Sequence, residues 1–221
     1  MTKFLYPYRF ELFLLTQVSI LFGSLFVPNI WFENWISPIL FIVNIAVGLV
    51  FFLNKKATFI FLSTLLIIIG LLSIESMFGN TDMRLYSFAR LTCFFLFYAI
   101  VTLEIIKQVA RAKTISRNLI FGLISGYIAL GFIAFFMFLT INIIEPNSFS
   151  GIQTDLNDTA ELNDKLMYFS YVTLLTIGYG EILPISDLAQ KGAIMVALVG
   201  QFYVVILTAI VVGKYVNQQN N

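Results

Sequence analysis

Long apolar runs separated by short polar breaks dominate the sequence. Four runs lie in the first half, at about 12–27, 36–53, 57–78 and 85–106, and two in the second half, at about 118–144 and 188–213. Each is close to the ~20 apolar residues that an α-helix needs to cross a bilayer core. None shows the period-two alternation of a transmembrane β-strand, and only helices and closed barrels satisfy the backbone in lipid. The pattern predicts an all-α membrane protein with six transmembrane helices.

A further apolar segment, from Asp164 to Leu175, is too short to span a membrane. It lies between the last two long runs, after a polar segment from Glu145 to Asn163. Asn163 or Asp164 is the expected N-cap of a short helix, because their side chains can accept hydrogen bonds from the free N–H groups of its first turn. A loop with two glycines follows, so we expect a re-entrant helix and loop.

Composition agrees with the bilayer as solvent and narrows the chemistry. The chain is 59% hydrophobic and 11% charged, whereas a soluble domain is about a quarter charged. It has no histidine and a single cysteine, Cys93, so common metal sites, acid–base pairs and an intrachain disulfide lack the residues they need. We expect a protein that is not an enzyme, has no cofactor and, lacking a basic block, does not bind nucleic acid.

The basic residues indicate an orientation. If the N-terminus is cytoplasmic, nine of the 13 Lys and Arg residues fall on the cytoplasmic side, and cytoplasmic loops are enriched in such residues. The interpretation is a multi-pass protein of the cell membrane with both termini in the cytoplasm. These nine residues are Lys3, Arg9, Lys55, Lys56, Lys107, Arg111, Lys113, Arg117 and Lys214.

The loop after the short helix carries the most specific motif. From Thr173 to Gly180 it reads T-L-L-T-I-G-Y-G, and Glu181 follows. This stretch resembles the selectivity filter of potassium channels, T-x-x-T-I-G-Y-G, and it stands at the end of a short apolar helix between two long ones. The resemblance implies a prokaryotic-type six-span potassium channel, in which this chain and three identical subunits form a homotetramer around a central pore. Such a channel conducts K⁺ passively.

The resemblance also assigns the ion-binding atoms. A dehydrated K⁺ ion needs oxygens in place of its water shell, and rings of backbone carbonyls can provide them. The carbonyls of Thr176, Ile177, Gly178 and Tyr179, with the Thr176 hydroxyl, would form the stacked sites. Gly178 and Gly180 can adopt positive φ without a Cβ clash, as such a loop requires. The Tyr179 side chain would point away from the axis and brace the loop.

The residues around this loop depart from the family pattern. Many members have Glu where this chain has Val172, Asp where it has Glu181, and a Trp donor where it has Phe169. Tyr168 or Tyr171 is the expected substitute donor. By resemblance, the Thr173 hydroxyl bonds behind the loop. The predicted filter supports are Thr173, Tyr168 and Glu181.

The last run carries the expected gate. Gly200 lies 20 residues after Gly180, the separation of the gating-hinge glycine in the family; close helix packing is the alternative explanation. Helical spacing places one stripe of residues where it would line a cavity: Gln201, Val204 or Val205, Thr208 and Val212. Gln201 and Thr208 could instead form hydrogen bonds between helices. The narrow gate is expected near 209–213.

Few charges lie where a voltage sensor would need them. A sensor requires several Arg or Lys residues at three-residue spacing along the fourth run, but the sequence has none between Arg90 and Lys107. We therefore expect weak or no voltage dependence. The predicted division is a four-helix membrane domain at 1–106, a basic linker at 107–117, a pore domain at 118–214 and a tail at 215–221.

Two other functions remain open from the sequence. The departures at Val172 and Phe169 are compatible with a less selective monovalent cation channel. A non-conducting membrane sensor or accessory subunit with a pore-like fold is the second alternative.

Overall fold

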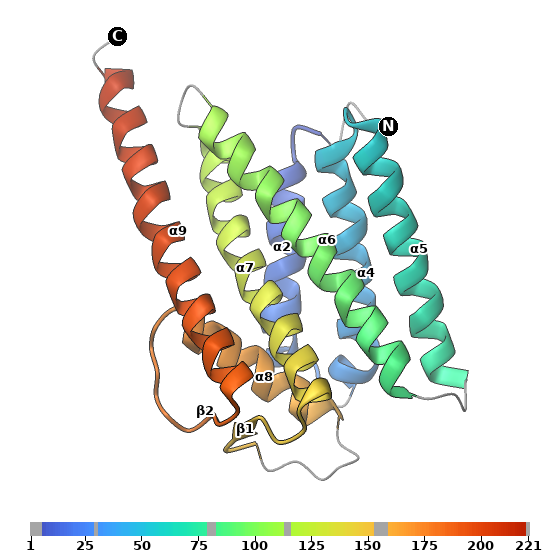
Figure 1. Cartoon of the computed structure of the whole chain (residues 1–221). Coiled ribbons are helices and arrows are strands. Elements are labelled where there is room, and N and C mark those ends of the chain that lie inside the picture. The colour runs from blue at the N-terminus through green and yellow to red at the C-terminus, as the bar shows by residue number, and fades with distance from the viewer. Residues whose placement is uncertain (1–5, 29–30, 79–82, 113–115, 153–158, 220–221) are drawn as a thin grey trace.

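A bundle of long helices makes up the chain in the computed structural model, which describes residues 6–28, 31–78, 83–112, 116–152 and 159–219 (Figure 1). The long helices run side by side, and α8 crosses the bundle at the end opposite the two termini. Short helical turns η1, η2 and η3 flank α4. The helices are α2 (Arg9–Phe22), η1 (Gly23–Leu25), η2 (Phe32–Ile36), α4 (Ser37–Gly48), η3 (Leu49–Phe52), α5 (Lys56–Phe78), α6 (Met83–Arg111), α7 (Arg117–Ile144), α8 (Thr159–Leu174) and α9 (Asp187–Gln219).

Each predicted apolar run coincides with a helix, and the mostly helical fold is confirmed. Among the described residues, three helical stretches are long and apolar enough to cross a membrane: Leu85–Arg111, Arg117–Ile144 and Asp187–Lys214. Ser37–Phe52 and Lys56–Leu72 are shorter apolar helices. Since α6 continues to Arg111, half of the predicted linker is helical; residues 113–115 lie outside the described part.

One detail of the prediction around α8 is wrong. Asn163 and Asp164 are not N-caps, because α8 already begins at Thr159. An i,i+4 ion pair at 2.6 Å joins Glu161 and Lys165 across the first turns, and such pairs stabilise a helix beyond the capping residue predicted from the sequence. In the segments that flank α8 and the loop after it, β1 (Phe149–Ser150) pairs antiparallel with β2 (Leu183–Pro184).

The core lies where α7 meets α4 and α6, and it is largely aromatic. The rings of Phe94 and Phe136 stack with centroids 4.7 Å apart, and Phe41 meets Phe136 edge-on at 5.6 Å. Tyr98 and Phe132, both fully buried, extend the same cluster. Aromatic pairs in such geometries stabilise a core beyond the area they bury. This cluster fixes α7 as a rigid support for the elements on its other side.

A hydrogen-bonded polar group is buried inside the same bundle. Asn44 is fully buried; its Nδ2 donates to the Phe13 carbonyl at 3.2 Å and to Thr16 Oγ1 at 2.6 Å. The Tyr98 hydroxyl donates to Asn44 Oδ1 at 2.6 Å. Asn44 thus links α2, α4 and α6, and its polar atoms are satisfied as burial in an apolar medium requires.

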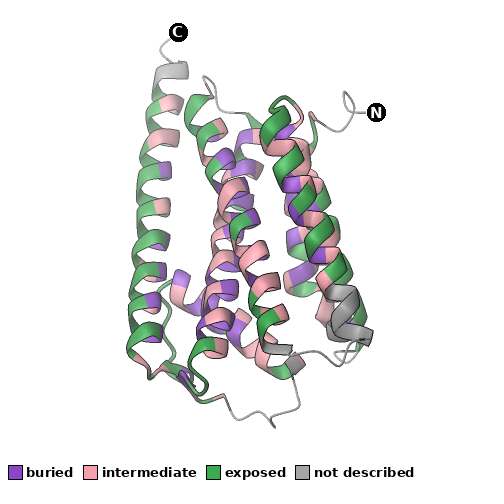
Figure 2. Ribbon diagram, turned by 45° about the vertical axis from the view of Figure 1, so that its right-hand side comes forward, coloured by how far each residue is buried: buried purple, intermediate pink, exposed green. Residues whose placement is uncertain are grey.

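The surface of α9 differs from that of its neighbours. Figure 2 shows α9 as largely exposed, with buried residues along one narrow face. That face contains Ala189, Val196, Gly200 and Leu207, whereas Val205 on another face is 63% exposed. In this single chain, α9 therefore leaves most of an apolar helix uncovered.

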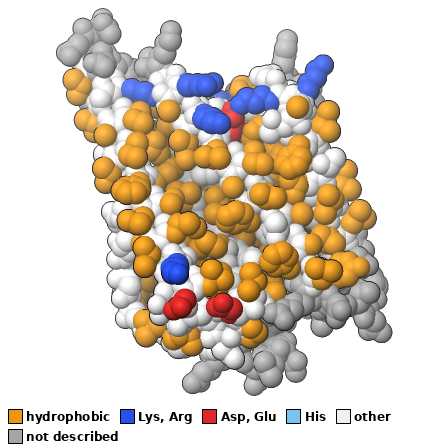
Figure 3. All heavy atoms as spheres, in the orientation of Figure 1, with side chains coloured by type: hydrophobic (Ala, Val, Ile, Leu, Met, Phe, Trp, Pro, Cys, Tyr) orange, Lys and Arg blue, Asp and Glu red, His pale blue; other side chains and the backbone are white. Residues whose placement is uncertain are grey.

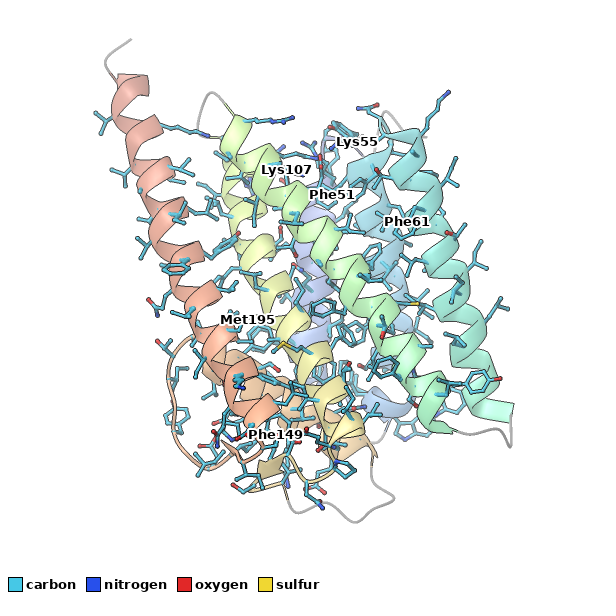
Figure 4. The ribbon with its side chains drawn as sticks, viewed as in Figure 1. Phe51, Lys55, Phe61, Lys107, Phe149 and Met195 are labelled. Atoms are coloured by element: carbon cyan, nitrogen blue, oxygen red, sulfur yellow. The ribbon has the colours of Figure 1, made fainter. Side chains whose placement is uncertain are left out.

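Charge is distributed unevenly along the bundle. Figure 3 shows Lys and Arg side chains mainly at the end that carries both termini, with an acidic side chain among them. A hydrophobic band lies in the middle, and acidic side chains lie beside a basic one toward the opposite end. Lys55 and Lys107 both lie at the first of these ends, and Phe149 lies at the other (Figure 4). Lys55 forms a close ion pair with Glu104. The basic residues expected on one side of a membrane thus gather at one end of the molecule.

Candidate functional site

The loop from Leu175 to Glu181 begins directly after the C-terminus of α8. The Thr176 N–H donates to the Thr173 carbonyl at 3.0 Å, and the Ile177 N–H donates to the Val172 carbonyl at 2.9 Å. These bonds use carbonyls that the last turn of a helix leaves free, so the start of the loop is fixed relative to α8. The C-terminal end of a helix also carries a partial negative charge, which favours a nearby cation.

The backbone of the loop alternates in handedness. Thr176, Gly178 and Gly180 have φ of 55°, 61° and 90°, whereas Ile177 and Tyr179 are not in the positive-φ region. Such alternation turns successive carbonyls toward one side of the strand. Positive φ was predicted for the two glycines and is confirmed. It was not predicted for Thr176, because a β-branched residue rarely adopts it.

Among the described residues, the side chains of the loop are largely exposed. Ile177 is 45% exposed and Tyr179 is 72% exposed. A Cβ built on Gly178 or Gly180 would meet no atom within 4 Å, so the backbone conformation, rather than space, requires glycine there. The predicted bracing role of Tyr179 therefore needs a neighbour from outside the chain.

The inner face of α9 approaches the base of the loop at Gly200. A Cβ on Gly200 would lie 2.3 Å from the Leu174 carbonyl oxygen, closer than any real contact. The next residue, Gln201, donates from Nε2 to Thr176 Oγ1 at 3.0 Å. Close packing of α9 against the end of α8 therefore accounts for the glycine at position 200. The sequence had left this explanation open as the alternative to a gating hinge. Gln201 was predicted to line a cavity or to form a hydrogen bond between helices, and it contacts the loop itself.

Three tyrosines lie around the C-terminus of α8, and the sequence did not predict their contacts. Tyr171 was expected only as a substitute donor to the filter tyrosine, and it donates to Ile128 instead. The Tyr171 hydroxyl donates to the Ile128 carbonyl at 2.8 Å, and that of Tyr127 donates to the Leu174 carbonyl at 3.3 Å. The Tyr203 hydroxyl donates to the Leu123 carbonyl at 2.7 Å. These bonds tie α7 to both α8 and α9. The paired small residues Gly126 and Gly131 of α7, which make room for Tyr203 and Tyr171, were the available signal.

The three residues predicted to support the loop differ in the contacts they make. The Tyr168 hydroxyl donates a hydrogen bond to Glu181, and this bond raises the pKa of the Tyr168 phenol. Two of the three predicted supports thus meet each other across the loop. Thr173 contributes its backbone carbonyl to Thr176, while the role of its hydroxyl stays a prediction. Phe169 packs on Phe138 and Phe149 in the core.

The β1–β2 ladder holds the segment after the loop. Gly151, with φ of 80°, lies so close to the Glu181 carbonyl that an added Cβ would be 1.9 Å from its oxygen. The Ile185 N–H donates to the Ser148 carbonyl at 2.8 Å. The Ser186 hydroxyl accepts from the Ala189 N–H and so caps the start of α9. Both ends of the loop are therefore anchored, and its middle is exposed.

The residues expected at the gate lie farther along α9. Thr208 and Val212 are exposed, and Thr208 also lines a cavity of about 350 Å³ between α7 and α9. At the end of the span, Lys214 Nζ donates to the carbonyls of Val109 and Ala110 at 2.8 and 2.9 Å. Gly200, Gln201, Thr208 and Val212 therefore follow one helix from the loop toward the terminal end of the bundle.

Carbonyl and hydroxyl oxygens are the cation ligands that the loop offers. In the part of the chain that the structure describes, no group of three or more His, Cys, Asp or Glu side chains could hold a metal ion. A string of backbone oxygens suits a hard monovalent cation that passes through rather than a tightly held transition metal.

One comparison with known proteins bears on this site. The family described as "Ion channel" matches residues 158–217, about a quarter of the chain. The match supports an ion channel. It covers α8, the loop and nearly all of α9, which are the elements that build the site. No curated protein and no solved structure matches the chain.

The match and the fold agree on two broader points. Apolar helices long enough to cross a bilayer, together with similarity to ion channels, indicate a membrane protein. Similarity to ion channels also points to a transport function without enzymatic chemistry.

Proposed function

We propose that this protein is a potassium-selective channel whose selectivity filter is the loop from Thr176 to Gly180. K⁺ moves passively through a central pore and is coordinated by the carbonyls of Thr176, Ile177, Gly178 and Tyr179, with the Thr176 hydroxyl as an additional ligand. The observation that carries the proposal is the alternation of positive φ at Thr176, Gly178 and Gly180. This conformation directs successive oxygens to one side, as carbonyl rings for a dehydrated ion require.

The pore is a homotetramer of this chain in the lipid bilayer. One loop offers one row of oxygens, whereas an ion must be surrounded. The exposed side chains of α9 and Tyr179 support this part of the proposal, since they leave apolar area for lipid and for neighbouring subunits to cover. Tyr179 then braces the filter from its own chain against an adjacent one.

The proposed architecture has six spans, formed by α2, α4, α5, α6, α7 and α9, with α8 as the re-entrant pore helix. Both termini lie in the cytoplasm of a cell-membrane protein, which the basic side chains at that end of the bundle support (Figure 3). The filter then opens to the outside. The domain limits predicted from the sequence apply, with the pore domain at 118–214.

Voltage has little effect on this channel. Between Arg90 and Lys107, α6 has no basic residue, so only a small charge could move through the membrane field. Within the bundle of α2, α4, α5 and α6, helices α4 and α6 instead support α7 through the aromatic cluster around Phe136.

Flux measurements on purified protein in liposomes test the proposal. K⁺ efflux driven by its gradient should exceed Na⁺ efflux under the same conditions at least tenfold. Equal fluxes would favour a less selective monovalent cation channel, which the apolar Val172 behind the loop is compatible with. A correctly assembled tetramer without flux would favour a non-conducting sensor or accessory subunit.

Gly178→Ala tests the site. Alanine at φ of 61° is strained by about 1 kcal/mol in each subunit, and a displaced carbonyl affects every ring, so K⁺ flux should fall at least tenfold. Gly70→Ala is the matched control, because Gly70 also has open space around it but lies in α5, without positive φ and outside the proposed pore domain. Undiminished flux in Gly178→Ala would refute the assignment of the filter.

A further inference from the structure

Gln201 contacts the one side-chain oxygen among the proposed ion ligands. Its Nε2 lies 3.0 Å from Thr176 Oγ1, although 25 residues separate the two in the chain. The other proposed ligands are backbone carbonyls, whose positions the loop conformation sets. A threonine hydroxyl, in contrast, can rotate about χ1 and can present either its proton or its lone pairs.

We propose that Gln201 is a positioning residue that determines K⁺ binding at the first site of the filter, counted from α8. This inference rests on the proposed function and specifies how one of its sites is formed. Because Gln201 donates to Oγ1, the hydroxyl oxygen is held as an acceptor and its proton is directed elsewhere. Its remaining lone pair is then free for a cation.

The neighbouring glycine allows this contact. With no side chain at Gly200, the backbone of α9 packs directly against the Leu174 carbonyl, where any Cβ would be 2.3 Å from the oxygen. Gln201 is the next residue on that helix, so it comes within reach of Thr176. A larger residue at 200 would push α9 away and lengthen the hydrogen bond from Gln201.

Thr176 also needs support because of its backbone. It is a β-branched residue with φ of 55°, a conformation that persists where surrounding contacts enforce it. Its N–H is held by the Thr173 carbonyl, and the next N–H by the Val172 carbonyl, both from α8. Gln201 adds a contact from α9. The first site therefore depends on two helices, and a change in α9 at Gln201 alters ion binding in the filter.

Block by Ba²⁺ applied from the α8 side of the filter tests this inference. Ba²⁺ is close to K⁺ in size and has twice its charge, so it binds K⁺ sites tightly and interrupts the current. Gln201→Met keeps the length of the side chain and removes the donor. One hydrogen bond lost per subunit should weaken Ba²⁺ block about fivefold.

A second substitution shows whether Gln201 acts through Thr176. In a Thr176→Ser background the hydroxyl remains, and Gln201→Met should again weaken block. In a Thr176→Ala background the hydroxyl is absent, and Gln201→Met should change Ba²⁺ binding less than twofold. Calorimetric Ba²⁺ binding to purified protein gives the same comparison if Thr176→Ala carries no current. An equal effect of Gln201→Met in the wild-type and Thr176→Ala backgrounds would mean a general structural role and would overturn the inference.

Gln190→Met is the matched control. Gln190 lies on the same helix and also donates one hydrogen bond, to the Pro184 carbonyl at 3.3 Å, but it does not contact Thr176. Its replacement should leave Ba²⁺ block within twofold of wild type. A selective wild-type channel with unchanged block in Gln201→Met overturns this inference alone. A wild-type protein that does not distinguish K⁺ from Na⁺ overturns the proposed function, whatever the variants do.

Discussion

Helices α7 and α9 are both long, apolar and adjacent to the candidate filter, yet they are packed very differently. In the apolar part of each span, 56% of the α7 segment is buried inside the chain, compared with 17% of the α9 segment. Helix α7 is in contact with α2, α6, α8 and α9, whereas α9 presents one face to α7 and α8. Hydrophobicity alone therefore does not tell what covers a helix. One apolar surface is completed by its own chain, and the other needs lipid or another subunit.

Adding a methyl group to each helix is the strongest test of this difference. In Gly131→Ala the new Cβ would lie 2.2 Å from the Tyr171 ring and would disturb its hydrogen bond to Ile128. Overpacking together with a lost buried hydrogen bond should lower the free energy of unfolding by about 3 kcal/mol. Gly213→Ala, with open space around it, should stabilise α9 by up to about 1 kcal/mol.

Unfolding of both variants in detergent, followed by helical circular dichroism, gives the two free energies. The change in the free energy of unfolding should have opposite signs in the two variants. Equal destabilisation would show that the terminal end of α9 is as closely packed as the middle of α7.

Removing a polar side chain from the buried interior of the bundle, and another from the exposed surface of α9, gives a smaller contrast. Asn44→Ala leaves the Tyr98 hydroxyl without its acceptor inside the bundle, which should cost about 2 kcal/mol. Thr208→Val replaces an exposed hydroxyl on α9 with a group of the same shape, and its effect should stay within about 0.5 kcal/mol. Denaturant titration of the two variants under identical conditions measures the change in the free energy of unfolding for each. A loss at Thr208→Val comparable to that at Asn44→Ala would place Thr208 in a buried network.

The contact that joins α9 to α6, at the end of the bundle that carries both termini, should have the smallest effect. Lys214→Met removes an ammonium group from the carbonyls of Val109 and Ala110, at the C-terminus of α6. A cation at a helix C-terminus contributes about 0.3–1 kcal/mol. Amide hydrogen exchange should accelerate in the last turns of α9 and remain unchanged around Asn44. Lys214→Arg keeps the charge and should retain most of the protection; exchange unchanged in Lys214→Met would show that this contact does not hold α9.

The sequence predicted the helices well because apolar runs of this length leave the backbone few alternatives. It also predicted positive φ at Gly178 and Gly180, since glycine is the residue that adopts it without strain. The N-terminal limit of α8 was wrong because Asn and Asp were taken as caps, although the ion pair from Glu161 to Lys165 extends the helix before them.

Contacts between distant residues could not be predicted in the same way. The pairing of Gln201 with Thr176 depends on how closely α9 approaches α8, which only the packing at Gly200 sets. The frame of Tyr127, Tyr171 and Tyr203 likewise depends on tertiary contacts, because a tyrosine in an apolar run has no sequence pattern that names its acceptor. The resemblance of the loop was enough to identify the site, whereas the residues that support it depend on tertiary packing that the sequence does not reveal.

The central claim is that the loop after α8 selects K⁺. The most direct test is the reversal potential of the current through purified protein in a planar bilayer, with K⁺ on one side and Na⁺ at equal concentration on the other. The account predicts a potential close to the K⁺ equilibrium value, with the same current lost in Gly178→Ala. A reversal potential near zero would contradict it.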